Sequence, residues 1–165
     1  MHHKDPILFE TFPLPSTSLY RTTIPGKYID SFGHVNNASY LNIFEDARWE
    51  ILNKKGMNID FIQKNKIGPV VTMVSVRYLK ELKESDAILV KSTPIGYKNK
   101  FIFTMKQEIF LLLDNSEEEK KSSEAYFDFA LFDLTHRKIL PPNDLWCDVL
   151  GLQKSHLEEM SKFVK

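Results

Sequence analysis

One stretch of the sequence decides the fold: it reads DSFGHVNNASYLNIFEDAR over residues 30–48. Its first part is polar, with an aspartate, a glycine, a histidine and two asparagines, and its second part is patterned as a helix. Between residues 37 and 53, apolar side chains recur at intervals of three and four, the period of one buried helical face. They are Tyr40, Leu41, Phe44, Ala47, Ile51 and Leu52. The stretch therefore predicts a polar loop leading into a long amphipathic helix.

The residues that flank this helix fit its expected ends. Asn36 and Asn37 are both suitable N-caps, because a short amide side chain can accept a hydrogen bond from the first turn. Gly56 is a suitable stop, because it tolerates the left-handed conformation that often ends helices. A helix of about 17 residues is roughly 25 Å long, and strands lie about 4.8 Å apart. It can therefore lie across a sheet of four or five strands.

Most of the remaining chain is patterned as strands. Residues 19–23, 69–77 and 87–93 are rich in residues that favour strands. Apolar residues alternate from 101 to 113, with Gln107 as the exception, and again from 125 to 131. The two alternating runs predict a long antiparallel hairpin, with the charged residues between them, 114–123, at its tip.

A second helix is expected after the sheet. Pro141 and Pro142 end the last strand, and Asn143 or Asp144 can cap a helix toward the C-terminus. Its apolar positions are Leu145, Val149, Leu157 and Met160. The order of one strand, a long helix, several antiparallel strands and a closing helix defines an α+β fold.

Composition and charge exclude several classes of protein. The chain has 165 residues, which predicts one domain, and 22 basic residues balance 22 acidic ones. No basic excess is present, so we expect no nucleic-acid partner. No apolar stretch approaches the roughly 20 residues of a spanning helix, so we expect no membrane association. Cys147 is the only cysteine and is expected to be a small buried side chain; no internal disulfide is possible, which fits a cytoplasmic protein.

The polar loop carries groups that could perform chemistry. Asp30 could act as a general base or a nucleophile, and His34 exchanges a proton near neutral pH. Backbone amides at the start of the helix can stabilise a developing oxyanion, and Gly33 lets the backbone approach a ligand closely. The same residue types also occur in turn and capping networks, so composition alone leaves both interpretations open.

The spacing resembles the signature of the hotdog-fold thioesterases, in particular the 4-hydroxybenzoyl-CoA thioesterase-like family. That motif runs Asp, two residues, Gly, His, Val, Asn, Asn, then Tyr at the start of the central helix, and the likeness continues to Arg48. The resemblance implies one long helix wrapped by an antiparallel sheet of about five strands, plus a C-terminal helix. We expect an arm over residues 1–18, the hotdog domain over 19–142 and a helical extension over 143–165.

The resemblance also implies a reaction and its residues. An acyl-CoA thioester would be hydrolysed to a carboxylic acid and free coenzyme A, without a cofactor or a metal. The implied catalytic residues are Asp30, His34 and Asn37, the last through its backbone amide. The implied substrate-binding residues are Gly33, Val35, Asn36 and Tyr40. The five histidines of the chain are too scattered to suggest a zinc site.

Some positions depart from the family pattern. Tyr28 stands where many relatives carry a polar residue, and Phe32 where the plant acyl carrier thioesterases carry an asparagine, so Asp30 has no obvious side-chain partner. Glu45, Asp46 and Glu50 on the helix are alternative acids. For Glu45 an ion pair with Arg48 is the simpler expectation. A non-catalytic hotdog module that binds acyl thioesters or serves in assembly remains the alternative, and a dehydratase a weaker one.

The family resemblance further implies a homodimer or a homotetramer with sites at the interface. Tyr126 and Phe132, on the second side of a single-layer sheet, would gain from being covered. Lys80, Lys98 and Lys100 are candidates for the phosphates of coenzyme A, although an ordinary surface lysine is the simpler interpretation of each.

Overall fold

The computed structural model describes residues 7–8, 16–113 and 119–151. The elements, in chain order, are β1 (Ile7–Leu8), β2 (Ser18–Thr23), the short 3-10 helix η1 (Gly26–Tyr28), α1 (Ser39–Lys54), α2 (Ile59–Asn65), β3 (Ile67–Tyr78), β4 (Ala87–Tyr97), β5 (Ile102–Leu112), β6 (Glu119–Asp133), β7 (Lys138–Leu140) and α3 (Asp144–Leu150). No helix in these ranges is long and apolar enough to cross a membrane.

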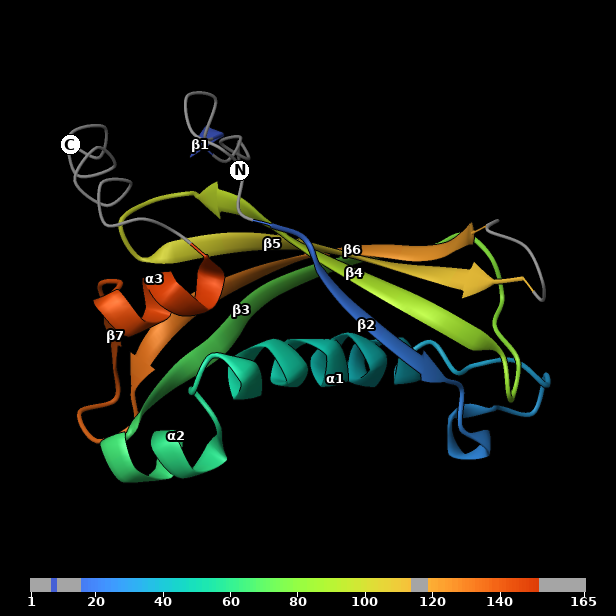
Figure 1. Ribbon diagram of the computed structural model, residues 1–165, viewed down its shortest axis with the longest axis horizontal. Coiled ribbons are helices and arrows are strands. Elements are labelled where there is room, and N and C mark those ends of the chain that lie inside the picture. The colour runs from blue at the N-terminus through green and yellow to red at the C-terminus, as the bar shows by residue number, and fades with distance from the viewer. Residues whose placement is uncertain (1–6, 9–15, 114–118, 152–165) are drawn as a thin grey trace.

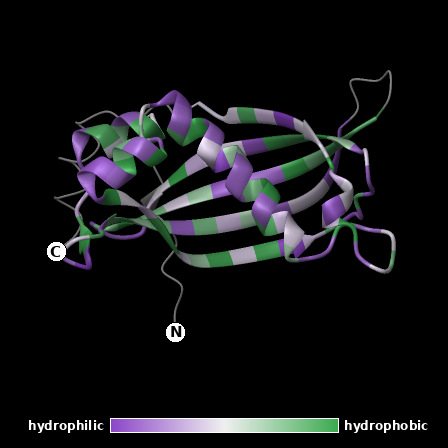
Figure 2. Cartoon of the chain, turned by 90° about the horizontal axis from the view of Figure 1, so that it is seen from below, coloured by the Kyte–Doolittle hydropathy of each residue, from purple (hydrophilic) through white to green (hydrophobic). Residues whose placement is uncertain are grey.

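A single antiparallel sheet forms the body of the molecule. Its strands lie in the order β1-β4-β5-β6-β3, with β2 also paired to β4 and β7 to β6. The helix α1 lies against one face of this sheet and crosses the strands, while α3 lies beyond the C-terminal end of α1 (Figure 1). Figure 2 shows hydrophobic and hydrophilic residues alternating along the strands beneath the helix. The expected α+β architecture, with one helix wrapped by a sheet, is confirmed.

The central helix begins slightly later than expected. Its N-cap position is Ala38, which has no side chain able to cap. Asn36 instead accepts a hydrogen bond from the Ala38 amide at 2.9 Å, one residue before the helix. Neither asparagine is therefore the N-cap, although Asn36 holds the chain as it enters the helix. Gly56 has a φ of +84° just past the helix, in agreement with the expected stop.

The buried face of α1 is centred on Phe44, which is fully buried and packs edge-on against Phe127 with ring centroids 5.5 Å apart. The predicted core positions Tyr40, Ala47 and Leu52 are also buried. The prediction for Leu41 was wrong, since this side chain is 36% exposed. The apolar periodicity places Leu41 at the edge of the predicted buried face. In the structure, this edge of α1 does not contact the core.

The predicted hairpin is confirmed, because β5 and β6 pair antiparallel over most of their length. Its expected loop was too long: β6 already begins at Glu119, and residues 114–118 lie outside the described residues. The strand β4 extends through Pro94 and Gly96, where a register shift accommodates both residues. The short elements β1, α2 and β7 were not predicted, because two to seven residues carry little periodicity.

The closing helix is shorter than expected in the described part of the chain. The side chain of Asn143 accepts a hydrogen bond from the Trp146 amide at 2.9 Å, which confirms it as the cap of α3. Gly151 ends the helix in the left-handed conformation, and the expected positions Leu157 and Met160 lie outside the described residues. Cys147 on α3 is buried, as expected.

Gln107, the exception in the alternation of β5, is fully buried beneath α1. Its amide nitrogen donates to the carbonyl of Phe44 at 3.1 Å and to the hydroxyl of Ser92 at 2.8 Å. Its oxygen accepts a hydrogen bond from Arg48 at 2.7 Å. One polar side chain thus joins α1 to β4 and β5 inside the core, where unsatisfied polar groups are costly.

The opposite face of the sheet carries charge rather than a dry apolar surface. Lys106, Glu108, Lys121 and Glu124 form a connected set of ion pairs across β5 and β6. Hydrogen bonds from the two lysines outweigh partial burial and lower the pKa of Glu108. Tyr126, on the same face, has the Lys106 ammonium 5.9 Å from its ring centroid. The aromatic side chains expected to need a cover are here partly covered by neighbouring cations.

We predict that Gln107→Met lowers the free energy of unfolding by about 1–3 kcal/mol, because it leaves Ser92 and Arg48 without their buried partner. Gln63→Met is the matched control, since Gln63 is exposed on α2. Urea denaturation followed by circular dichroism measures both. An equal effect of the two substitutions would contradict a structural role for the buried amide.

Candidate active site

The polar loop forms a tight turn at the N-terminal end of α1. The amide of Gly33 donates to the carbonyl of Asp30 at 3.0 Å, and the amide of Asp30 donates to the carbonyl of His34 at 2.9 Å. A single β-bridge between Ile29 and Val35 closes the turn. Gly33 has a φ of +77°, a conformation that other residues adopt only with strain. The glycine of the motif is therefore required by the backbone.

The carboxylate of Asp30 is oriented by the backbone of its own turn. One oxygen, Oδ1, accepts a hydrogen bond from the Phe32 amide at 2.9 Å. The sequence offered no side-chain partner for Asp30, and the structure supplies this main-chain donor instead. The Phe32 side chain is 83% exposed and projects from the turn. The second oxygen, Oδ2, has no hydrogen bond to any described residue, so it remains available to a substrate or a water.

The start of α1 presents a backbone donor next to this carboxylate. The Ala38 amide is engaged by Asn36, but the Asn37 amide has no acceptor within the described part of the chain. The carbonyl of Asn37 accepts a hydrogen bond from the Tyr78 hydroxyl at 3.0 Å, which fixes the orientation of this residue. An unengaged N–H near the positive end of a long helix is suited to stabilise an oxyanion.

An open hollow contains most of the residues that the motif predicted. Asp30, His34, Val35, Asn37 and Tyr40 all line it. Gly33 and Asn36 do not line it: the first shapes the turn and the second holds the entrance of the helix. The fold therefore brings the carboxylate of Asp30 and the first residues of α1, with the backbone amide of Asn37, to the same hollow.

Besides Phe32 of the turn, the rest of the lining comes from the end of β3 and the segment after it, where the sequence had suggested only Lys80. Tyr78, Leu79, Lys80 and Glu81 line the hollow, more than 35 residues after the motif. The rings of Tyr78 and Tyr40 meet edge-on with centroids 5.1 Å apart. No local pattern marks these residues, because only the path of β3 across the sheet brings them to the loop.

Glu81 has a direct contact with the motif. One of its carboxylate oxygens lies 3.5 Å from Nε2 of His34, and both side chains are partly exposed. This contact holds the imidazole at the rim of the hollow. Tyr40 is buried, which raises the pKa of its phenol, while a hydrogen bond with Ser122 offsets part of the effect. Tyr40 therefore stays protonated at neutral pH and acts as a donor, to the Lys80 carbonyl at 3.4 Å.

The alternative acids on α1 lie elsewhere. Glu50 pairs with Lys54 at 2.8 Å, and Asp46 lies beside Tyr28 in a different hollow. The expected ion pair between Glu45 and Arg48 was wrong, because Arg48 turns to Gln107 and stacks over Phe127, with 4.2 Å to the ring centroid. None of the three acids lines the hollow around Asp30.

The three candidate lysines are separated by the fold. Lys80 lines the hollow beside Asp30. Lys98 is paired with the buried Asp128 at 2.7 Å, and Lys100 lies over the ring of Phe101. Both follow the end of β4, which points away from the turn that carries Asp30 (Figure 1). Within the described ranges, no three His, Cys, Asp or Glu side chains are grouped as a metal site would require.

Comparison with known proteins identifies the family. The model of the thioesterase-like superfamily matches residues 25–151. That range includes the turn, α1 and all the long strands except β2. The chain therefore belongs to the thioesterase-like superfamily, and its helix-in-sheet architecture is the hotdog fold of that family.

Individual relatives agree with this assignment. The chain is 30% identical over 69 residues to the long-chain acyl-CoA thioesterase FadM of Escherichia coli, covering 42% of this chain and 52% of that protein. It is 29% identical over 86 residues to the chloroplastic acyl-acyl carrier protein thioesterase ATL3 of Arabidopsis thaliana, covering 48% and 45%. The chain thus spans about half the length of the relatives it matches.

A solved structure extends the likeness over most of the chain. The probable thioesterase YbaW of Escherichia coli superposes with a TM-score of 0.67 at 25% sequence identity. The match covers 81% of this chain and 96% of that one. The arrangement of α1 and the sheet is therefore shared with an experimentally determined thioesterase fold.

We predict that Gly33→Ala destabilises the protein by about 1–2 kcal/mol, because the left-handed conformation strains any residue with a Cβ. Ser31→Ala, in the same turn, is the control and should change the free energy of unfolding by less than about 0.5 kcal/mol. Thermal unfolding of the two variants makes the comparison. Equal stability of both would show that the turn relaxes without the glycine.

Proposed function

We propose that the protein is an acyl-CoA thioesterase in which Asp30 and the Asn37 amide act on the thioester from two sides. The observation that carries this proposal is their shared hollow: an oriented carboxylate and an unengaged amide at the start of a long helix. A thioester carbonyl needs a nucleophile on one side and a donor for the developing oxyanion on the other. Family membership supports hydrolysis of a thioester as the reaction.

The reaction uses groups already present on this chain. With Asp30 as base, a water attacks the carbonyl carbon, its proton passes to Oδ2, and the negative charge develops on the carbonyl oxygen beside the Asn37 amide. Cleavage of the carbon–sulfur bond releases the thiolate of coenzyme A, which takes up the proton. Direct attack by Asp30, followed by hydrolysis of the resulting anhydride, gives the same products. Both routes need the second carboxylate oxygen to be available.

We infer the carrier of the acyl group from the charged residues around the hollow. Lys80 lines the hollow from the segment after β3, and we propose that it meets a phosphate of coenzyme A. FadM acts on acyl-CoA and ATL3 on an acyl carrier protein, as their names state. With zero net charge, this protein offers no general attraction to an acidic carrier protein. We therefore favour a coenzyme A thioester.

We predict that Asp30→Asn lowers kcat for acyl-CoA hydrolysis by about 10²–10⁴-fold, because an amide can neither take up the proton nor attack the carbonyl. Asp60→Asn, in the first turn of α2, is the matched control and should retain full activity. Release of free thiol from a panel of acyl-CoAs measures both. Equal rates for wild type and Asp30→Asn would remove Asp30 from the mechanism, and absence of turnover on every substrate would refute the activity.

We further propose that the protein is a homodimer joined along β3. This strand is the last of the sheet order and pairs only with β6 among the described strands, so its other edge presents free backbone groups. On this strand the side chain of Met73 is exposed. The charged opposite face is a poor surface for a second apolar contact, which favours a dimer over a tetramer.

We predict that Met73→Lys shifts the protein from dimer to monomer, because a charge beside an open strand edge opposes pairing with another strand. Ile139→Lys, at an exposed position on β7, is the control and should leave the dimer intact. Sedimentation velocity at several protein concentrations distinguishes the two states. A dimer that survives Met73→Lys would place the interface on another surface.

A further inference from the structure

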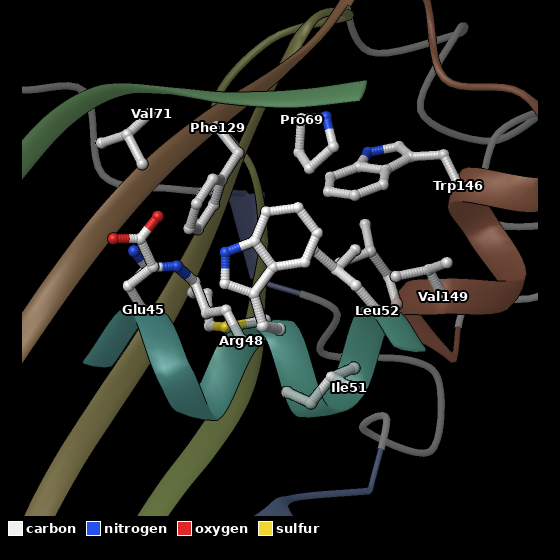
Figure 3. Close-up of a pocket in the computed structure, with 12 residues that line it drawn as sticks. Glu45, Arg48, Ile51, Leu52, Pro69, Val71, Phe129, Trp146 and Val149 are labelled. Carbon is white, nitrogen blue, oxygen red and sulfur yellow. The ribbon is translucent and has the colours of Figure 1, made fainter. Parts of the chain in front are cut away.

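A second hollow lies at the opposite end of α1, between the C-terminal half of this helix, β3 and α3 (Figure 3). Its cavity volume is about 100 Å³, and it is open to solvent on one side. Its apolar lining includes Trp49, Leu52, Pro69, Phe129, Trp146 and Val149. The chain has two tryptophans, and both line this one hollow. Figure 3 shows the labelled Leu52, Trp146 and Val149 together at the end formed by α3.

The polar groups of the lining are few and already engaged or turned to solvent. Arg48 donates to Gln107 and lies over the rings of Phe127 and Phe129, and burial lowers its pKa to about 10. It is therefore still charged at neutral pH, but its charge is held against the aromatic wall. Glu45 is on an exposed turn of the helix. Apart from the indole N–H groups of the two tryptophans, the remaining walls carry no polar side chain, which favours an aliphatic occupant.

One face of α1 joins this hollow to Asp30. Residues 37, 41, 45, 48 and 52 recur at intervals of three and four, so they lie along one side of the helix. This row begins at the unengaged amide of Asn37 and ends at Leu52 in the second hollow. Leu41, the apolar residue predicted for the core but found 36% exposed, stands between the two sites.

The strand β3 supplies the other side of this path. Val71, Val74 and Tyr78 are on the face of the sheet that α1 covers, because they pair with Phe129, Phe127 and Ser123 on β6, whose phenylalanines pack under the helix. They nevertheless remain 47%, 38% and 49% exposed. The helix therefore leaves an apolar strip open on β3, which runs from the Asp30 hollow to the tryptophans.

We propose that this strip and the second hollow bind the tail of an unbranched aliphatic acyl chain whose thioester carbonyl lies at Asn37. This inference rests on the proposed thioesterase function and specifies its substrate. The distance from Asn37 to the second hollow sets the length of the acyl chain. Along the helix, Asn37 is roughly 12 Å from Glu45 and 22 Å from Leu52, at 1.5 Å per residue. An extended chain advances about 1.2 Å per bond, so about 12 to 16 carbons reach into the hollow.

The length of this path favours a long acyl tail over other occupants of the strip. An aromatic acyl group, a single ring beyond the carbonyl, ends near Leu41 and leaves the partly exposed Trp49 uncovered. A second copy of the chain that pairs along the edge of β3 extends the sheet sideways and leaves the strip facing α1. The acyl tail is the occupant whose shape fits both the narrow strip and the apolar end.

Tryptophan fluorescence tests binding without relying on hydrolysis. In the Asp30→Asn variant, tetradecanoyl-CoA should shift the emission to shorter wavelength in a saturable manner, because the tail covers Trp49, which is only partly buried, whereas Trp146 is already buried. Butyryl-CoA and coenzyme A should leave the emission unchanged, because their chains end before Glu45. An equal response to long and short thioesters, or no response to the long one, overturns the proposal. An emission shift that appears on raising the protein concentration without any thioester also overturns the proposal, since the strip would then be a contact between two copies of the chain.

A variant at the mouth of the hollow tests specificity. Val71→Phe narrows the path at an exposed position, and Ile139→Phe adds the same ring on β7, outside it. Val71→Phe should lower kcat/KM for tetradecanoyl-CoA at least tenfold and leave that for butyryl-CoA within twofold. Ile139→Phe should change neither. The butyryl-CoA rate and the thermal unfolding temperature report whether Val71→Phe is folded, and an equal loss on both substrates by the folded variant overturns the assignment.

The two proposals fail in different ways. A fluorescence response to tetradecanoyl-CoA with no hydrolysis of any thioester by wild type supports the tail site and refutes the thioesterase activity. Hydrolysis at equal rates for all chain lengths, with no fluorescence response, supports the activity and overturns the tail site.

Discussion

The placement of α1 across the sheet depends on the buried amide of Gln107. A helix that rests on an apolar sheet by hydrophobic contact alone can slide or rotate, because such contacts have little directionality. Gln107 bonds the Phe44 carbonyl, Arg48 and Ser92, and so ties one turn of the helix to β4 and β5. Since this turn is the middle of α1, both ends of the helix are positioned by it.

The two ends of α1 have different physical properties, and we propose a different role for each. The N-terminal end offers an unengaged amide beside the Asp30 carboxylate, a polar and open environment suited to bond cleavage. The C-terminal end faces α3 and both tryptophans, an apolar environment suited to binding. Because α1 leaves Val71, Val74 and Tyr78 of β3 exposed, an open apolar strip lies between the two environments. A single helix therefore links the proposed chemistry to the choice of substrate.

Much of this could be predicted from residues 30–48. The motif with its glycine and the helix follow from local spacing there, and the hairpin of β5 and β6 follows from the alternation in residues 101–113 and 125–131, because turns and periodic burial are encoded within a few residues of each other. The N-cap and the position of Leu41 were wrong, since both depend on how the helix meets the sheet. Tyr78 and Glu81, which contact Asn37 and His34, could not be found, because no local pattern relates a strand end to a loop more than 35 residues earlier.

The sequence by itself determined the fold class, the turn that holds Asp30 and the family, since each depends on short-range spacing. The tertiary structure decided which residues surround that turn, that Arg48 pairs with Gln107 rather than with Glu45, and that both tryptophans meet in one hollow. The physical reason is that strand pairing brings segments together that are distant in the sequence. In addition, α1 is too narrow to cover the whole sheet, so part of β3 stays exposed.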